Sequence, residues 1–165
     1  MGEIVLKTMN LSKSFKRRQV LKNVSIELER RKIYGFIGLN GAGKTTLMRV
    51  LTGLVKKDTG SLSLFNETNE HLLNEKRKRI GSLIDTPAYY PRMTARENLD
   101  MARISRGLPN KSFIDELLKA VGLEEAGKKK VKDFSLGMKQ RLGIAQALLC
   151  EPDLLILDEP YNGLD

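Results

Sequence analysis

The sequence has little of what disulfide-linked, metal-binding and membrane-spanning proteins need. It contains no tryptophan, one cysteine and one histidine. A lone cysteine, Cys150, excludes a disulfide within the chain, and its neighbours lack metal-ligand spacing, so we expect a packed thiol. His71 lies in a polar stretch and is expected at the surface. No apolar run approaches the roughly 18 residues that span a bilayer, and the first residues form no signal peptide, which predicts a cytosolic chain.

Length and composition are those of one globular domain. The 165 residues include 41% hydrophobic and 30% charged side chains, which suits a single core. The formal net charge of +9 could suit a nucleic acid or an anionic membrane surface. No aromatic residues are interleaved with the basic clusters, however, so solvated faces are the favoured interpretation. The clusters lie at residues 16–18, 30–32, 76–79 and 128–132.

Strand and helix patterns alternate along the chain after an N-terminal β part. Residues 2–28 predict antiparallel strands around a basic turn at 16–19. Helices are expected from two capping boxes, which are Thr94 with Glu97 and Ser112 with Asp115. This order predicts an α/β domain around a largely parallel sheet. Other expected helices cover 44–54, 70–79 and the second half of 134–149, and other expected strands cover 32–38, 61–65, 79–85 and the fully buried 154–158.

The strongest motif is GLNGAGKT at residues 38–45, which fits the P-loop pattern G-x-x-x-x-G-K-[ST] between an expected strand and an expected helix. The glycines let backbone N–H groups turn towards phosphate oxygens, and the start of the helix adds partial positive charge. Lys44 can reach the β- and γ-phosphates, and the Thr45 hydroxyl can hold Mg²⁺. The predicted nucleotide-binding residues are Gly38, Leu39, Asn40, Gly41, Ala42, Gly43, Lys44, Thr45 and Thr46.

Two adjacent carboxylates, Asp158 and Glu159, follow an apolar strand near the end of the chain. Without a P-loop, such a pair would more often be a helix cap or a solvated turn. Beside a P-loop, Asp158 is placed to contact Mg²⁺, and Glu159 is placed to orient or deprotonate the attacking water. We therefore predict nucleotide hydrolysis with Glu159 as the catalytic residue.

These motifs together resemble the nucleotide-binding subunit of an ABC transporter, and the resemblance spans nearly the whole chain. The segment FSLGMKQRLGIAQALL resembles the family's signature segment. Ser135 and Gly137 match its LSGGQ pattern, whereas Phe134, Leu136 and Met138 depart from it. The resemblance implies that the four residues from Ser135 to Met138 meet an ATP molecule bound to an opposite subunit.

The resemblance also assigns roles outside the signature segment. It implies that Phe15 stacks on adenine and that Asp165 belongs to the D-loop. Asp85 stands where the family usually has glutamine, and the residue there contacts Mg²⁺ and the attacking water on a loop that faces the transmembrane partner. The charge of Asp85 should strengthen the Mg²⁺ contact, although its reach is shorter. This acidic variant, followed by TP and an aromatic pair, resembles bacitracin- and lantibiotic-type exporters and immunity systems.

The implied fold is that of a P-loop NTPase with a RecA-like parallel core sheet, an N-terminal antiparallel β subdomain and an α-helical signature subdomain. By this resemblance, the antiparallel part covers about 1–30, the P-loop core 31–84, the helical subdomain 85–150, and the acidic strand with the D-loop 151–165. Family members carry a further core strand and a histidine beyond the acidic strand. The chain is therefore expected to be an incomplete ABC ATPase domain that hydrolyses ATP poorly by itself.

The implied ligands and partners are ATP, Mg²⁺, a second ATPase subunit in a head-to-tail dimer, and a transmembrane permease. Through the permease, the cytoplasmic chain is expected to be peripheral on the inner face of the plasma membrane. The expected function is to power export of, or immunity to, a peptide antibiotic of the bacitracin or lantibiotic type. Two alternatives stay open: a soluble ABC ATPase acting on the ribosome or DNA, and a basic nucleic-acid-binding module. Salt-dependent nucleic-acid binding without an ATP effect would favour the module, and no specific nucleic acid is expected.

Overall fold

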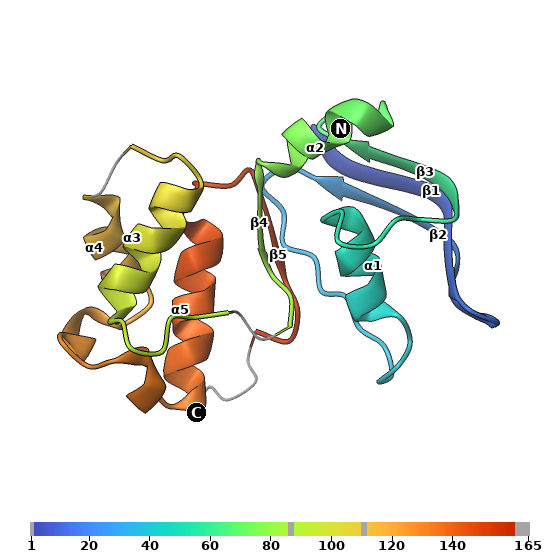
Figure 1. Ribbon diagram of the computed structural model, residues 1–165. Helices are drawn as coiled ribbons and strands as arrows, with labels where there is room; N and C mark the ends of the chain where they lie inside the picture. The colour runs from blue at the N-terminus through green and yellow to red at the C-terminus, as the bar shows by residue number, and fades with distance from the viewer. Residues whose placement is uncertain (1, 86–87, 110–111, 161–165) are drawn as a thin grey trace. The chain divides into compact units, whose positions relative to one another are not determined.

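The computed structural model describes residues 2–85, 88–109 and 112–160 (Figure 1). The chain forms two compact units, Met1–Ile80 and Gly81–Asp165. Each unit has its own secondary structure and its own buried side chains, and each is described by itself below. The finer division into four segments that the sequence suggests stays a prediction.

The first unit is built on a three-stranded antiparallel sheet in the order β2-β1-β3, with strands β1 (Ile4–Phe15), β2 (Arg18–Glu29) and β3 (Thr59–Leu64). The expected N-terminal hairpin and short third strand are confirmed. The hairpin turns at the basic residues, where Lys16 has a φ of 54°. Leu6, Leu11 and Leu64 are fully buried, so apolar side chains of β1 and β3 supply the core of this unit.

Two helices complete the first unit. Helix α1 (Lys44–Leu51) buries Leu47, Val50 and Leu51, and helix α2 (Glu70–Arg77) buries Leu73. Asn69 caps α2 by accepting a hydrogen bond from the backbone N–H of His71. The His71 side chain is exposed, as its polar surroundings in the sequence predict.

The strand expected at residues 32–38 is not present. Residues 33–40 have no regular secondary structure, and the side chains of Ile33 and Ile37 are fully exposed. A β-strand requires a neighbour whose N–H and C=O groups complete the ladder. Neither sheet of the described residues contains a strand that pairs with this segment. The apolar run therefore lacks the partner that would make it a strand, and the prediction is wrong for this structure.

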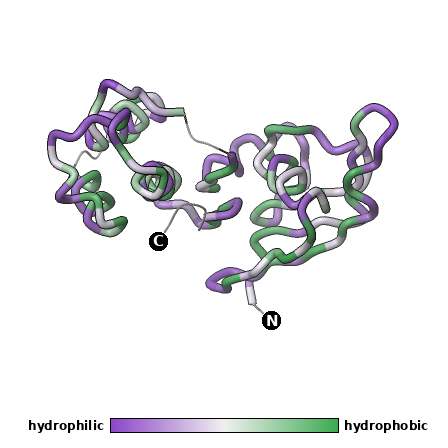
Figure 2. Tube along the Cα trace, turned by 90° about the horizontal axis from the view of Figure 1, so that it is seen from below, coloured by the Kyte–Doolittle hydropathy of each residue, from purple (hydrophilic) through white to green (hydrophobic). Residues whose placement is uncertain are grey.

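The second unit joins a two-stranded sheet to a helical cluster. The strands are β4 (Ile80–Leu83) and β5 (Leu154–Leu157), and the helices are α3 (Ala95–Ser105), α4 (Phe113–Ala120) and α5 (Leu136–Leu148), with short 3₁₀ turns η1 (Glu124–Ala126) and η2 (Val131–Asp133). Apolar residues of α3, α4 and α5 form one buried cluster that includes Leu99, Ile114 and Leu142. Figure 2 shows hydrophobic and hydrophilic residues alternating along these helices. Among the described residues, no helix is both long and apolar enough to cross a membrane.

The sheet of the second unit lies close to α5. A Cβ atom at Gly81 of β4 would collide with the backbone carbonyl of Ala147 in α5, so the absence of a side chain permits this approach. Strand β5 is less buried than its apolar sequence predicts, because β4 is its one partner strand in the described chain. Ile156 is buried, but Leu155 is 37% exposed, which corrects the expectation of a fully buried strand.

The two predicted capping boxes have different outcomes. At the start of α3, Thr94 Oγ1 accepts from Glu97 N–H at 3.2 Å and Glu97 Oε2 accepts from Thr94 N–H at 2.6 Å, so this capping box is confirmed. Ser112 precedes α4 but has helical dihedral angles and makes no capping hydrogen bond with its side chain. The carboxylate of Asp115 instead pairs with Arg96.

Replacing Thr94 with alanine is expected to lower the free energy of unfolding by about 1 kcal/mol, because one N–H at the start of α3 loses its acceptor. Denaturant unfolding measures this loss. Thr68→Ala is the matched control, since Thr68 is exposed and lies outside any helix, and it is expected to change stability by less than about 0.5 kcal/mol. Equal unfolding midpoints for the two variants would contradict the capping role.

Candidate nucleotide-binding site

The P-loop residues precede and begin helix α1. Gly43 is the N-cap of this helix with a φ of 95°, and Gly41 has a φ of 80°, both in the left-handed region. A Cβ at Gly43 would also lie 2.9 Å from the Val20 carbonyl oxygen of β2. Glycine is therefore required at position 43 both by the backbone angle and by the close approach of the hairpin.

Lys44 holds the P-loop in a closed turn. Its Nζ donates to the carbonyl oxygens of Gly38 at 2.7 Å and Leu39 at 3.0 Å, and Ala42 N–H donates to Leu39 O at 3.1 Å. Residues 38–42 are exposed, while Thr45 and Thr46 lie half-buried in the first turn of α1. The Lys44 ammonium group thus lies beside two carbonyl oxygens at a helix N-terminus. The positive charge of the ammonium group and of the helix N-terminus suits phosphate oxygens.

Phe15 lies at the end of the hairpin that touches the P-loop. Phe15 pairs with Arg18 and Ser14 with Gln19, one residue before the Val20 carbonyl that approaches Gly43. The Phe15 ring is 45% exposed, and Lys13 Nζ lies 5.4 Å from the ring centroid. The structure therefore brings the hairpin end that carries the predicted adenine-stacking residue to the loop predicted to bind phosphates, within one unit.

The acidic residues of the second unit share one edge of its sheet. Asp158 N–H donates to Leu83 O at 2.8 Å, which joins the ends of β5 and β4 and shows that the strands run parallel. Asp85 comes two residues after Leu83, and Glu159 directly follows Asp158. Asp85, Asp158 and Glu159 are thus gathered where two parallel strands end, which is the edge where α/β sheets bind ligands.

Two of these acids have uncommon backbone angles. Asp85 has a φ of 62° and Glu159 a φ of 45°, and both are non-glycine residues in the left-handed region. The Glu159 carbonyl accepts a hydrogen bond from Gln140 Nε2 of α5 at 3.4 Å. Seven other non-glycine residues of the described chain also have a positive φ, so the angle sets the direction of these side chains but does not by itself mark a functional residue.

The signature residues form the start of helix α5. Ser135 is the N-cap, and its Oγ accepts from Met138 N–H at 3.2 Å. Leu136 is exposed and Gly137 half-buried in the first turn, whose N–H groups have no acceptor within the helix. Phe134 is 5% exposed and packs in the helical core, so this departure from the family pattern lies where it fills space rather than at the exposed helix end.

The loop that follows Asp85 is fastened to the helices of the same unit. Tyr89 Oη donates to the Lys139 carbonyl of α5 at 2.7 Å, and burial raises the pKa of Tyr89, so the hydroxyl keeps its proton. Tyr90 N–H donates to the buried side chain of Asn98 at 2.8 Å. These bonds fix the loop against α3 and the first half of α5, where the signature residues begin.

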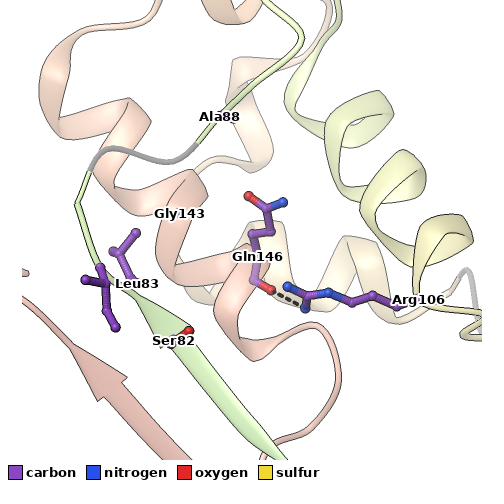
Figure 3. Close-up of a pocket in the computed structure, with 7 residues that line it drawn as sticks. Ser82, Leu83, Ala88, Arg106, Gly143 and Gln146 are labelled. Carbon is purple, nitrogen blue, oxygen red and sulfur yellow. Dashed lines mark hydrogen bonds between the residues drawn. The ribbon is translucent and has the colours of Figure 1, made fainter. Parts of the chain in front are cut away.

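A hollow of about 240 Å³ lies beside this loop (Figure 3). Arg106 is the one charged residue in its lining and donates to the Gln146 carbonyl at 3.1 Å, as the dashed line in Figure 3 marks. Ser82, Leu83, Ile84, Ala88 and Gly143 complete the lining. Among the described residues, its lining thus combines apolar and uncharged polar residues with one guanidinium group.

The residues predicted to hold Mg²⁺ have suitable chemistry. Thr45 offers a hydroxyl oxygen, and Asp85 and Asp158 offer carboxylates, which are the ligands that Mg²⁺ prefers. Thr45 belongs to the first unit and both aspartates to the second. Residues 2–85, 88–109 and 112–160 contain no group of three His, Cys, Asp or Glu side chains able to hold a metal.

Two further points separate the sequence predictions from the structure. Asp165, the predicted D-loop residue, lies outside the described residues. No motif in the sequence points to Asp58, whose carboxylate contacts the strand end that carries Phe15. Asp58 and Lys13 are 45 positions apart, so no local motif could have joined them.

The glycine-bounded loop with its lysine at a helix start, the acidic sheet edge and the capped signature helix together define an ABC-type ATPase domain. Residues 21–162 match the ABC transporter family, and the chain belongs to this family. The expected fold is confirmed by the solved ATP-binding subunit of an ABC transporter, which is similar with a TM-score of 0.84 and 32% identity over 98% of this chain and 68% of that one. The cbiO1 subunit from Clostridium perfringens, part of the ABC transporter complex cbiONQ, has a TM-score of 0.80 at 27% identity over 99% and 68% of the chains.

Curated relatives agree with the subfamily that the sequence suggests. The chain is 48% identical to the bacitracin transport ATP-binding protein BcrA of Bacillus licheniformis over 98% of this chain and 53% of the relative. It is 48% identical to the lantibiotic transport ATP-binding protein SrtF of Streptococcus pyogenes over 98% of this chain and 69% of the relative. An uncharacterized ABC transporter ATP-binding protein, YcbN of Bacillus subtilis, is 49% identical over 98% and 52%. The chain therefore spans about half the length of the first curated relatives it matches.

Proposed function

We propose that this chain is the ATP-binding and ATP-hydrolysing part of an ABC transporter that exports a peptide antibiotic or gives immunity to one. The observation that carries the proposal is the P-loop at α1, where Gly43 has a φ of 95° and Lys44 Nζ lies among loop carbonyl oxygens. Family membership supports ATP as the nucleotide. Similarity to BcrA and SrtF supports bacitracin- or lantibiotic-type compounds as the transported class.

ATP binding is proposed to replace the internal contacts of the P-loop. The Lys44 ammonium would leave the Gly38 and Leu39 carbonyls for the β- and γ-phosphates, because charge-assisted hydrogen bonds to phosphate are stronger than bonds to neutral carbonyls. Phe15 would stack on the adenine ring. The backbone N–H groups at the start of α1 would then surround phosphate oxygens.

Hydrolysis is proposed to depend on the acids at the end of β4 and β5. We propose that Thr45, Asp85 and Asp158 would hold Mg²⁺, which would supply positive charge against the charge that develops on the phosphates. Glu159 would accept a proton from the attacking water or orient it, and its backbone is held to α5 through Gln140. Asp85 has a shorter side chain than glutamate, so we propose that its left-handed backbone serves to aim the carboxylate.

Two copies are proposed to act together in a head-to-tail dimer. The exposed start of α5, with Ser135 as N-cap, would bind the γ-phosphate held by the opposite copy through helix N–H groups. The loop after Asp85 is proposed to face the transmembrane permease, which would keep the protein at the inner face of the plasma membrane. The Tyr89 bond to Lys139 would carry movements of that loop to α5.

Antibiotic resistance tests this proposal most directly. The complete protein is to be expressed with its membrane partner in a sensitive bacterium, and the minimal inhibitory concentrations of bacitracin and of a lantibiotic measured. We expect resistance to at least one compound, and we expect Lys44→Ala to abolish it at equal expression. Resistance that is the same with Lys44→Ala would show that ATP binding by this chain is not what protects the cell.

A further inference from the structure

Asp58 lies directly before β3, beside the end of β1. Its Oδ2 accepts from Ser14 N–H at 2.7 Å, its Oδ1 accepts from Lys13 Nζ at 2.6 Å, and its own N–H donates to Ser12 O at 3.0 Å. Three groups of Asp58 thus contact three consecutive residues of β1. The next residue after Ser14 is Phe15.

The Asp58 carboxylate supplies a hydrogen-bond acceptor to β1 at the point where its pairing with β3 ends. The last pair between β1 and β3 joins Ser12 to Thr59, so β3 does not reach Ser14. Residues two apart on a strand direct their backbone groups to the same side, and Ser14 N–H therefore faces the side that β3 has left. The carboxylate of Asp58 supplies the acceptor that a longer β3 would have supplied.

The same carboxylate fixes a cation over the Phe15 ring. The pairing of β1 with β2 is irregular between Lys13 and Ser14, and the side chains of Lys13 and Phe15 lie together at this end of the strand. Lys13 Nζ is bonded to Asp58 and lies 5.4 Å from the ring centroid, within the range of a cation–π contact. Asp58 thus acts on Phe15 in two ways. It binds the backbone of the preceding residue, Ser14, and it holds the Lys13 ammonium group near the Phe15 ring.

We propose that Asp58 is a positioning residue for nucleotide binding, which orients Phe15 to stack on adenine by holding Ser14 N–H and the Lys13 ammonium group. This inference rests on the proposed function, because it assigns the Phe15 ring to the base of ATP. Asp58 acts on the base alone, since its contacts are with β1 and not with the P-loop.

The charge state of Asp58 is consistent with this role. The hydrogen bonds from Lys13 and from Ser14 N–H lower the pKa of Asp58, so the carboxylate is ionised at neutral pH. A carboxyl group whose pKa is lowered in the folded state keeps its contacts above its usual pKa and loses them as the pH falls through the lowered value. ATP affinities measured at pH 7 therefore refer to a protein in which Asp58 is ionised and bonded to Lys13 and Ser14.

The experiment compares the affinity for Mg-ATP with the affinity for inorganic tripolyphosphate, which has no base, by calorimetry on the full chain. Asp58→Ala is expected to weaken ATP binding about 3- to 10-fold, because the aromatic–base stack loses part of its support, and to change tripolyphosphate binding by less than about twofold. Phe15→Ala should show the same selectivity with a loss of about tenfold or more. Asp58→Asn keeps an oxygen acceptor for Ser14 N–H without the charge, so its ATP affinity should lie between that of the unsubstituted chain and that of Asp58→Ala.

Glu27→Gln is the matched control, because it breaks an ion pair with Lys7 in the same sheet, away from Phe15. It should leave both affinities unchanged. Equal losses for ATP and tripolyphosphate in Asp58→Ala and Asp58→Asn would show a general effect on folding and overturn the inference. Unchanged ATP affinity in both variants would overturn the role of Asp58 but not the proposed function. No ATP binding by the unsubstituted chain would overturn both.

Discussion

Replacing Lys44 with alanine is expected to weaken Mg-ATP binding at least about 100-fold. The substitution removes the ammonium group that would bind two phosphates, and hydrogen bonds to charged groups contribute about 1.5–3 kcal/mol each. Calorimetry with Mg-ATP measures the loss. The same substitution removes the bonds to Gly38 O and Leu39 O, so the P-loop of the nucleotide-free protein should also become more open to amide exchange.

Lys78→Ala is the matched control for this variant. Lys78 is also a lysine of the first unit, but its side chain is 72% exposed and forms a surface ion pair with Glu75. Surface pairs contribute little to stability, and Lys78 is remote in sequence from the P-loop. ATP affinity should therefore stay unchanged in Lys78→Ala. If Lys44→Ala binds Mg-ATP as tightly as the unsubstituted chain, the P-loop does not bind the phosphates of ATP.

The conformation of the loop predicted to bind phosphates could be anticipated because its determinants are local. The glycine spacing, the lysine and the helix start all fall within residues 38–51, and the structure has Gly41 and Gly43 in backbone conformations that favour glycine. The acidic edge depends on more than local pattern. Asp158 and Glu159 could be singled out beside a P-loop, but Asp85 is suggested only by the family resemblance, and it comes near them because β4 and β5 are neighbours in the sheet.

The missing strand at 32–38 shows where local pattern ceases to be sufficient. Its apolar residues match a buried strand, but a strand exists only with a neighbour, and the neighbour is set by the tertiary structure. The network around Asp58 has the same origin. Its partners Lys13 and Ser14 are more than 40 positions away, so the sequence could suggest Phe15 by resemblance but not the residue that holds it.

Replacing Glu159 with glutamine is expected to leave Mg-ATP binding nearly unchanged and to slow ATP hydrolysis about 100-fold or more. Glutamine has the same shape but cannot accept a proton from water, and general base catalysis contributes about 10²–10⁴ in rate. The hydrogen bond from Gln140 is made to the backbone carbonyl of residue 159, so the substitution leaves this contact in place. Steady-state phosphate release by the complete protein measures the rate, and calorimetry measures the binding.

Glu151→Gln is the control that separates the catalytic carboxylate from its backbone conformation. Glu151 is an exposed glutamate in the same unit, and its φ of 46° is close to the 45° of Glu159. Glu151→Gln makes the same exchange of carboxylate for amide at a left-handed residue outside the acidic sheet edge, so it should hydrolyse ATP at the rate of the unsubstituted chain. If the carboxylate of Glu159 acts on water, only Glu159→Gln should be slow, and ATP should drive its complete form into a stable dimer on gel filtration, because bound ATP is no longer consumed. Rapid turnover by Glu159→Gln would assign the base to another residue at the same sheet edge, for which Asp85→Asn is then the decisive variant.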